Sequence, residues 1–306
     1  MRRRWRLVLL VLLVVAGGLA GCQAQRAAEE PPRDPTRSPI RVASFDFPES
    51  VILAEIYAGA LEGAGYPVER ILALGSRELV EPALEQGKVD LVPEYAGSAL
   101  RFLGGTASAD QAATVGRLRA AYARRGVAVL GPAPAQDSNA FAVTDAFASR
   151  HGVRTLSDLR RIAGDLVLGG PPECPERPLC LLGLRQVYGL NFKEFRPVES
   201  RDLTAAQLQG GELDVGMLQT TDGHLSSGAF VLLDDDRRMQ PAENVTPVVR
   251  RPVLRTFGAP LAERIDLVSS RLNTGSLTEM NRRVQLTQEP PATVAADWLD
   301  GERLAG

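Results

Sequence analysis

The chain has 306 residues, of which 44% are hydrophobic and 24% are charged, and its formal net charge is −2. This composition is typical of a globular protein long enough for two domains, and the charge gives no reason to expect a nucleic-acid partner. The sequence has no nucleophile elbow, zinc motif, Walker loop or dinucleotide fingerprint, and its two histidines, His151 and His224, are far apart. We therefore expect a protein that is not an enzyme and uses neither a metal ion nor a cofactor.

The first residues have the features of an export signal. The basic start MRRRWR is followed by the apolar run LVLLVLLVVAGGLA, which is short for a membrane span. The run ends in LAGC, which resembles the lipobox of bacterial lipoproteins. The resemblance implies a signal peptide at residues 1–21, a lipid on the sulfur of Cys22, and an extracytoplasmic protein anchored to the bacterial cell membrane. The alternative is an ordinary signal peptide or membrane anchor with an incidental cysteine.

Two further features follow from the composition beyond Cys22. Residues 22–39 are polar and rich in proline and alanine, so we expect a flexible tether. The other two cysteines, Cys174 and Cys180, stand close together in CPERPLC. Outside the cytosol such a pair is expected to form a disulfide, and no further ligands that would favour a metal site lie nearby.

From Ile40 onward, strand-like and helix-like segments alternate. Apolar spacing and capping residues predict strands at 40–44, 66–74, 89–93 and 127–131, and helices at 51–65, 77–86 and 110–126. Pro132 and Pro134 then interrupt the pattern. A second series follows, with strands at 166–170, 213–218 and 230–235, helices at 156–163, 181–189 and 203–210, and C-terminal helices at 261–272, 277–286 and 294–300.

Strands separated by helices predict parallel sheets and the α/β class. Residues 241–249 have the pattern of a strand that returns to the first domain. We therefore expect lobe I to comprise residues 40–137 plus 243–306, and lobe II to comprise residues 138–242.

A short unit occurs once in each predicted lobe. Leu84, Gly87 and Asp90 share their spacing with Leu208, Gly211 and Asp214, and each set joins a helix end to a strand. Ligands of open α/β sheets collect beyond the carboxyl ends of the strands, so the following segments PEYAGS and MLQTTDG are expected to face one cleft. The repeat then places Tyr95 opposite Gln219. Coincidence is the alternative, because Gly-x-apolar-Asp carries little information, and both aspartates are expected to bond local backbone.

The same segments show a family resemblance. Residues 52–100, 168–195 and 214–223 resemble the binding-protein component of ABC importers for glycine betaine, choline and related osmoprotectants. The resemblance implies a two-lobed type II periplasmic-binding-protein fold with a two-strand hinge, and a monomer that delivers solute to ABC permease and ATPase subunits. A solute sensor that uses the same fold to signal to a membrane partner is the alternative.

The family's quaternary ammonium ligands are held by aromatic faces and nearby carboxylates, because such cations have no hydrogen-bond donors. Tyr95 matches a tyrosine of the family cage. At other positions the family often has a different residue: a tyrosine at Val92 and near Asn139, an aromatic residue at Gln219, and a glutamine at Ser50. The aromatic cage is therefore expected to be depleted, and the cleft to suit a polar solute at least as well as a bare trimethylammonium.

The expected ligand-binding residues come from both lobes. Tyr95 could instead be a buried tyrosine with a satisfied hydroxyl, and Asp222 could cap a turn. The candidates are Ser44, Ser50, Glu94, Tyr95, Ser98, Asn139, Gln219, Thr220, Thr221 and Asp222, with Ser76 and Arg77 as further donors at the cleft edge.

Overall fold

The structure, a computed structural model, describes residues 38–306. The predicted signal peptide, Cys22 and nearly all of the predicted tether lie outside the described residues. Within the described part of the chain, no helix is long and apolar enough to cross a membrane.

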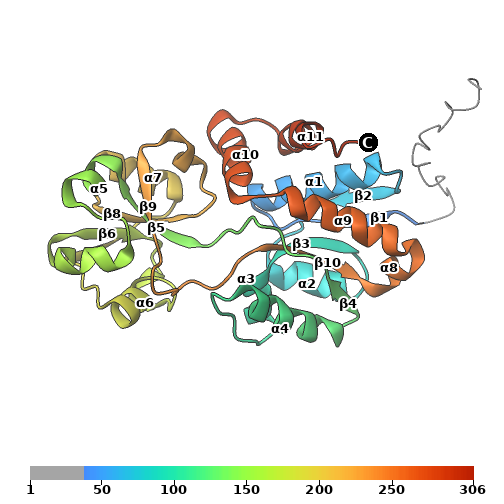
Figure 1. The fold of residues 1–306 in the computed structure, drawn as a ribbon, viewed down its shortest axis with the longest axis horizontal. Coiled ribbons are helices and arrows are strands. Elements are labelled where there is room, and N and C mark those ends of the chain that lie inside the picture. The colour runs from blue at the N-terminus through green and yellow to red at the C-terminus, as the bar shows by residue number, and fades with distance from the viewer. Residues whose placement is uncertain (1–37) are drawn as a thin grey trace, which may run out of the picture. The chain divides into compact units, whose positions relative to one another are not determined.

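Two five-stranded sheets form the framework, one in each lobe (Figure 1). The lobe I sheet has the order β2-β1-β3-β10-β4, with β1 (Ile40–Ala43), β2 (Val68–Ile71), β3 (Leu91–Tyr95), β4 (Val127–Val129) and β10 (Val245–Arg250). The lobe II sheet has the order β7-β6-β8-β5-β9, with β5 (Asn139–Thr144), β6 (Val167–Gly170), β7 (Glu194–Pro197), β8 (Val215–Gln219) and β9 (Phe230–Leu233). The predicted α/β class and two-lobed architecture are confirmed.

Each sheet contains a strand that the chain enters after crossing from the other lobe. β10 is antiparallel to both β3 and β4, and β5 is antiparallel to both β8 and β9, whereas the other pairings are parallel. The two crossings lie side by side: Gln136 bridges Asn244, and the Asp137 amide donates to the Glu243 carbonyl at 3.1 Å. These paired segments form a two-strand hinge.

Helices cover both sheets. In lobe I they are α1 (Pro48–Gly63), α2 (Arg77–Glu85), α3 (Ala96–Phe102), α4 (Gln111–Ala123), α8 (Arg251–Phe257), α9 (Ala259–Arg271), α10 (Thr274–Thr287) and α11 (Pro291–Gly301). In lobe II they are α5 (Asp145–His151), α6 (Leu181–Gly183) and α7 (Arg201–Gln209). Three of these helices, α3, α5 and α8, were not predicted from the sequence, and residues 156–161 form a 3-10 helix where a helix was expected.

The repeated unit has the same structure in both lobes. Gly87 and Gly211 both adopt left-handed backbone conformations, with φ of 74° and 71°, that end α2 and α7. The Asp90 carboxylate accepts the Arg41 amide of β1 at 3.1 Å, and the Asp214 carboxylate accepts the Val167 amide of β6 at 2.8 Å. Each aspartate therefore fastens its strand to the neighbouring parallel strand, as expected of residues that bond local backbone.

Cys174 and Cys180 are joined by a disulfide in lobe II, with their Cα atoms 5.2 Å apart. Both cysteines are buried and pack with Leu181 and Leu184 in the lobe II core. The predicted disulfide is thus present, and it stabilises a loop that follows β6.

Candidate functional site

A cavity of about 370 Å³ lies where the two lobes meet, and we refer to it as the central cavity. Its walls come from the start of α1, α2 and α7, the ends of β3 and β8, the hinge, and α10. The lining residues are Phe47, Pro48, Glu49, Arg77, Tyr95, Ser98, Asp137, Arg201, Gln219, Thr221, Asp222, Asn281 and Gln285.

The central cavity is one part of a longer cleft. A neighbouring cavity of about 450 Å³ shares Gln219, Asp222, Arg201 and Gln285 with it. The largest of the four cavities described for residues 38–306, about 700 Å³, is lined by the disulfide loop of lobe II and residues 105–109 of lobe I. We place the site in the central cavity because the buried carboxyl groups of Glu49 and Asp137 line it and line none of the other described cavities.

Glu49 contributes a buried carboxyl group to the central cavity, and the residue is 5% exposed. The Tyr95 hydroxyl donates to its Oε1 at 2.6 Å, and the Asn281 amide donates to its Oε2 at 2.5 Å. Burial raises the pKa of Glu49 above its usual value, and hydrogen bonds from Thr221, Tyr95 and Asn281 only partly offset that rise. Residues from α1, β3 and α10 are thereby joined around one carboxyl group.

Asp137 belongs to the hinge and lies close to Glu49 of α1. Burial raises its pKa well above the usual range, and the negative charge of Glu49 raises it further. The Thr221 side chain is close enough to lower the pKa of both carboxyl groups. Its hydroxyl has a single hydrogen, so it can donate to only one of them at a time.

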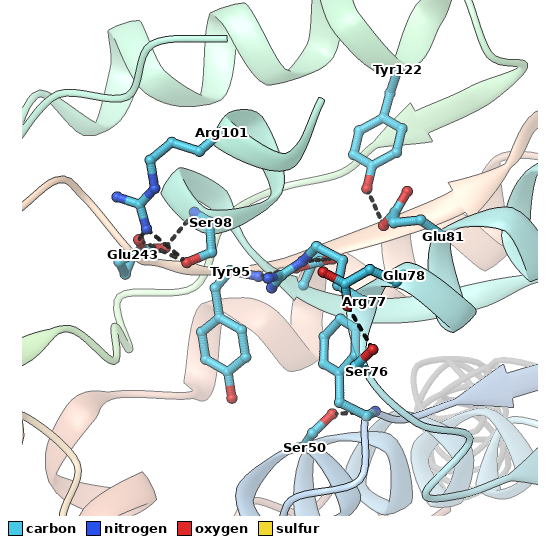
Figure 2. A network of polar contacts seen from close by, with 12 residues as sticks. Ser50, Ser76, Arg77, Glu78, Glu81, Tyr95, Ser98, Arg101, Tyr122 and Glu243 are labelled. Carbon is cyan, nitrogen blue, oxygen red and sulfur yellow. Dashed lines mark hydrogen bonds and ion pairs between the residues drawn. The ribbon is translucent and has the colours of Figure 1, made fainter. Parts of the chain in front are cut away.

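Arg77 brings a positive charge to the cavity wall from a buried network in lobe I (Figure 2). Its guanidinium forms two hydrogen bonds to Glu94, at 2.8 and 2.9 Å. Behind this pair, Tyr122 donates to Glu81 at 2.6 Å. Burial, followed by the charge of Glu94, raises the pKa of Glu81 to about 8.

Lobe II contributes a second arginine. Arg201, the first residue of α7, lies 3.0 Å from the Asp222 carboxylate. Asp222 also caps the 3-10 turn Gly223–Ser227 and accepts from the backbone and ring of His224. Burial opposes ionisation of Asp222, but the His224 hydrogen bonds and the Arg201 charge hold its pKa below the usual value.

The aromatic wall is small. Tyr95 and Phe47 are the two aromatic residues of the central cavity, with ring centroids 6.0 Å apart. Phe45 stacks on Phe47 at 5.8 Å and lies beneath the Arg77 guanidinium at 4.9 Å. Val92, at a position where the family often has a tyrosine, is fully buried in the lobe I core.

The structure brings five of the predicted site residues together in the central cavity: Tyr95, Ser98, Gln219, Thr221 and Asp222. Tyr95 and Gln219 line it from opposite lobes, as the repeat predicted, and Arg77 also lines it. Ser98 is held by Glu243, which accepts both its amide and its hydroxyl.

The other predicted residues lie elsewhere. Ser44 and Ser50 are fully buried, and their hydroxyls accept the amides of Ala73 and Phe45, so they support the fold next to the cavity. Ser76 donates to Glu78. Glu94 lies behind Arg77, and Asn139 and Thr220 line the adjoining cavities.

Five charged or polar lining residues were missed by the sequence analysis: Glu49, Asp137, Arg201, Asn281 and Gln285. Glu49 and Arg201 each stand at a helix start, which the strand-to-helix junctions could have indicated. Asn281 is a buried polar residue beside Leu277 and Met280 on α10, a pattern that marks a polar function within an apolar face.

The paired sheets, the hinge and the polar cavity between the lobes define a two-lobed solute-binding protein. Residues 38–301 match the family described as the substrate binding domain of the ABC-type glycine betaine transport system, and the chain belongs to that family. It is therefore a solute-binding protein of ABC importers and not an enzyme.

Known proteins resemble the chain over most of its length. It is 30% identical to the glycine-betaine-binding protein of Pseudomonas aeruginosa, over 85% of this chain and 86% of that protein. It is 27% identical to the glycine betaine-binding protein YehZ of Escherichia coli, over 86% of this chain and 90% of that protein. A crystal structure described as a glycine betaine/carnitine/choline ABC transporter has the same fold, with a TM-score of 0.81, 22% identity, and coverage of 87% of this chain and 100% of that one.

Proposed function

We propose that the protein captures a small polar solute of the glycine betaine and choline class, or a related osmolyte, in the central cavity. Closure of the two lobes about the hinge traps the solute, and an ABC permease with its ATPase receives it from the closed form. Neither the family match nor the relatives' names favour the alternative of a solute sensor.

The observation that carries this proposal is the composition of the central cavity. Two aromatic rings, Phe47 and Tyr95, adjoin the buried carboxyl groups of Glu49 and Asp137, while lobe II supplies Thr221 and other polar groups from the far side. Aromatic faces and carboxylates attract a cation, and hydroxyl, amide and guanidinium groups suit the polar remainder of such a solute.

The test is calorimetric titration of the purified protein with choline, glycine betaine, carnitine, and neutral and anionic osmolytes. Tyr95→Ala removes an aromatic face and is expected to weaken binding of the best ligand about 2- to 30-fold, corresponding to roughly 0.5–2 kcal/mol of cation attraction. Phe102→Ala is the matched control, because Phe102 is 42% exposed and lines none of the described cavities. Absence of binding across the panel, or equal affinities of the two variants, would contradict the proposal.

We further propose that the protein acts as a monomer attached to the cell membrane through a lipid on Cys22. The lipobox-like LAGC at the end of the apolar run supports this attachment. A Cys22→Ser variant is expected to leave the membrane fraction, and an acyl mass increment on the N-terminal peptide should disappear with it. Retention of the variant in the membrane would contradict lipid anchoring.

A further inference from the structure

Three residues that line the central cavity each have a buried side-chain oxygen atom without a hydrogen-bond donor: Asp137 Oδ1, Asn281 Oδ1 and Asp222 Oδ2. Asp222 Oδ2 lies 3.0 Å from Arg201 Nε, so of these three atoms only Asp137 Oδ1 and Asn281 Oδ1 lack both a hydrogen bond and an ion pair within residues 38–306. Asn281 is only 2% exposed. A buried acceptor without a donor is unfavourable by about 1–3 kcal/mol, so such atoms are rare in folded proteins unless a function requires them.

The orientation of Asn281 is fixed by its surroundings. Its amide nitrogen donates to Glu49 Oε2 at 2.5 Å and to the Thr221 carbonyl at 2.8 Å. Both partners are acceptors, so exchanging the nitrogen and oxygen positions would lose two hydrogen bonds and place oxygen against oxygen. The Asn281 oxygen therefore remains the unpartnered atom.

The charges around the cavity are unevenly balanced. Three carboxylates in or behind its wall are paired with arginines: Glu94 with Arg77, Asp222 with Arg201, and Glu243 with Arg101. Among the described residues, Glu49 and Asp137 have no ion-pair partner within 4.0 Å. The cavity thus has two carboxyl groups without an ion-pair partner, those of Glu49 and Asp137, and two oxygen atoms without a donor, of which one belongs to Asp137 and the other to Asn281.

The cavity calls for both a positive charge and hydrogen-bond donors, and a trimethylammonium group supplies only the first. It carries the positive charge, but it has no N–H with which to satisfy an acceptor. The aromatic surface that would favour it is limited to Phe47 and Tyr95, and the Tyr95 hydroxyl already donates to Glu49. A nitrogen that is both positively charged and hydrogen-bearing meets both requirements.

We infer that the preferred solute presents a cationic group with N–H donors, such as a protonated amine, a guanidinium or an imidazolium, to Asp137 and Asn281. This inference rests on the proposed function, because it concerns the ligand of the same cavity. It departs from a fully methylated ammonium group as the optimal guest.

The test compares cations that differ only in methylation. The purified protein is titrated at pH 7 with ethanolamine, its N-methyl and N,N-dimethyl derivatives, and choline, and with the corresponding series from glycine to glycine betaine. Agmatine and arginine represent guanidinium cations, and neutral and anionic osmolytes complete the panel. Affinity that falls with each added methyl group, or tight binding of a guanidinium solute, is the expected result.

The outcomes separate this inference from the proposed function. Tightest binding of choline or glycine betaine, or binding of neutral or anionic solutes alone, would overturn the inference and leave solute capture intact. Binding of no solute in the panel would overturn both.

A substitution tests whether Asp137 makes the protein prefer N–H-bearing cations over trimethylated ones. Asp137→Asn keeps the shape but removes the ionisable carboxyl group, and is expected to weaken the best N–H-bearing cation about 10- to 100-fold, with less than about threefold change for its trimethylated counterpart. Asp165→Asn is the matched control, because Asp165 is exposed and lines none of the described cavities. Equal weakening of both cations in the Asp137 variant would indicate a structural role and overturn the inference.

Discussion

Replacement of Glu81 by glutamine is expected to stabilise the protein at alkaline pH. Glu81 is 1% exposed, and its Oε2 has no hydrogen-bond partner within the described residues. Because burial and the charge of Glu94 raise its pKa from 4.5 to about 8, the folded state binds this proton more tightly than the unfolded state. The resulting stability is complete below pH 4.5 and is lost as pH rises through 8.

The loss in the wild type is on the order of 5 kcal/mol, since the pKa rises from 4.5 to about 8 and each unit of pKa difference corresponds to about 1.4 kcal/mol. Glutamine cannot ionise, and its carbonyl oxygen can still accept the hydrogen bond from Tyr122. The Glu81→Gln variant should therefore show a flatter dependence of unfolding free energy on pH between 5 and 8.5.

Glu94 gives the same network a second test. Removing one member of a buried ion pair usually costs about 3–5 kcal/mol, because the other charge is left uncompensated. In Glu94→Gln, however, the charge of Glu94, which is the second cause of the raised pKa of Glu81, is gone; burial still raises that pKa, and Arg77 still lowers it. Glu81 should then ionise and replace Glu94 as the partner of Arg77, so the single substitution should cost only about 1–2 kcal/mol.

In the double variant, Glu81 can no longer take over as the partner of Arg77. Glu81→Gln combined with Glu94→Gln leaves Arg77 without a carboxylate partner and should cost the full ~3–5 kcal/mol, which gives a coupling of about 2 kcal/mol or more. Urea unfolding followed by circular dichroism at several pH values measures all four proteins. Glu263→Gln is the control, because Glu263 is exposed on α9. Additivity within about 0.5 kcal/mol, or an unchanged pH profile in Glu81→Gln, would refute the reasoning.

Two further predictions concern lobe II. Replacing Cys174 and Cys180 by alanine should lower the free energy of unfolding by about 2–2.5 kcal/mol, as expected for a short closed loop, and an unchanged urea midpoint would contradict this. A Cβ at Gly223 would lie 2.7 Å from the Cα of Arg282 in α10, so Gly223→Ala should disfavour this contact between the lobes by about 1–3 kcal/mol. Solute titration and small-angle scattering would detect the change, whereas Gly164→Ala, with nothing within 4 Å, is the control and should behave as wild type.

Local turn chemistry made the framework predictable. Gly87 and Gly211 end their helices in left-handed conformations, and Asp90 and Asp214 bond the neighbouring strand, so the sequence repeat reflected a structural one. Alternating strand and helix patterns then defined the α/β class. By contrast, the short α3 has no side-chain cap, because its N-cap residue is Tyr95, so no capping signal in the sequence distinguished it from a loop.

The cavity was only partly predictable because its members come from distant parts of the chain. Tyr95 and Gln219 follow strands, and the strand ends of an α/β sheet identify such positions. Glu49 and Asn281 are 232 residues apart and meet only because α1 and α10 pack together. No local pattern at either residue indicates the other, and Asp137 depends on how the hinge crosses between the lobes.

The arrangement separates the groups that hold the fold from the groups that define the guest. Asp90, Asp214 and Glu94 fix the strand and helix ends through backbone and arginine contacts, and all three lie outside the central cavity. Glu49 and Asp137 project into that cavity from a helix start and a hinge segment, where a substitution changes charge without removing a strand pairing. Ligand chemistry can therefore vary on this scaffold while the sheets stay unchanged, so the unpartnered acceptors and the carboxyl groups without an ion pair bear more directly on the solute than the fold does.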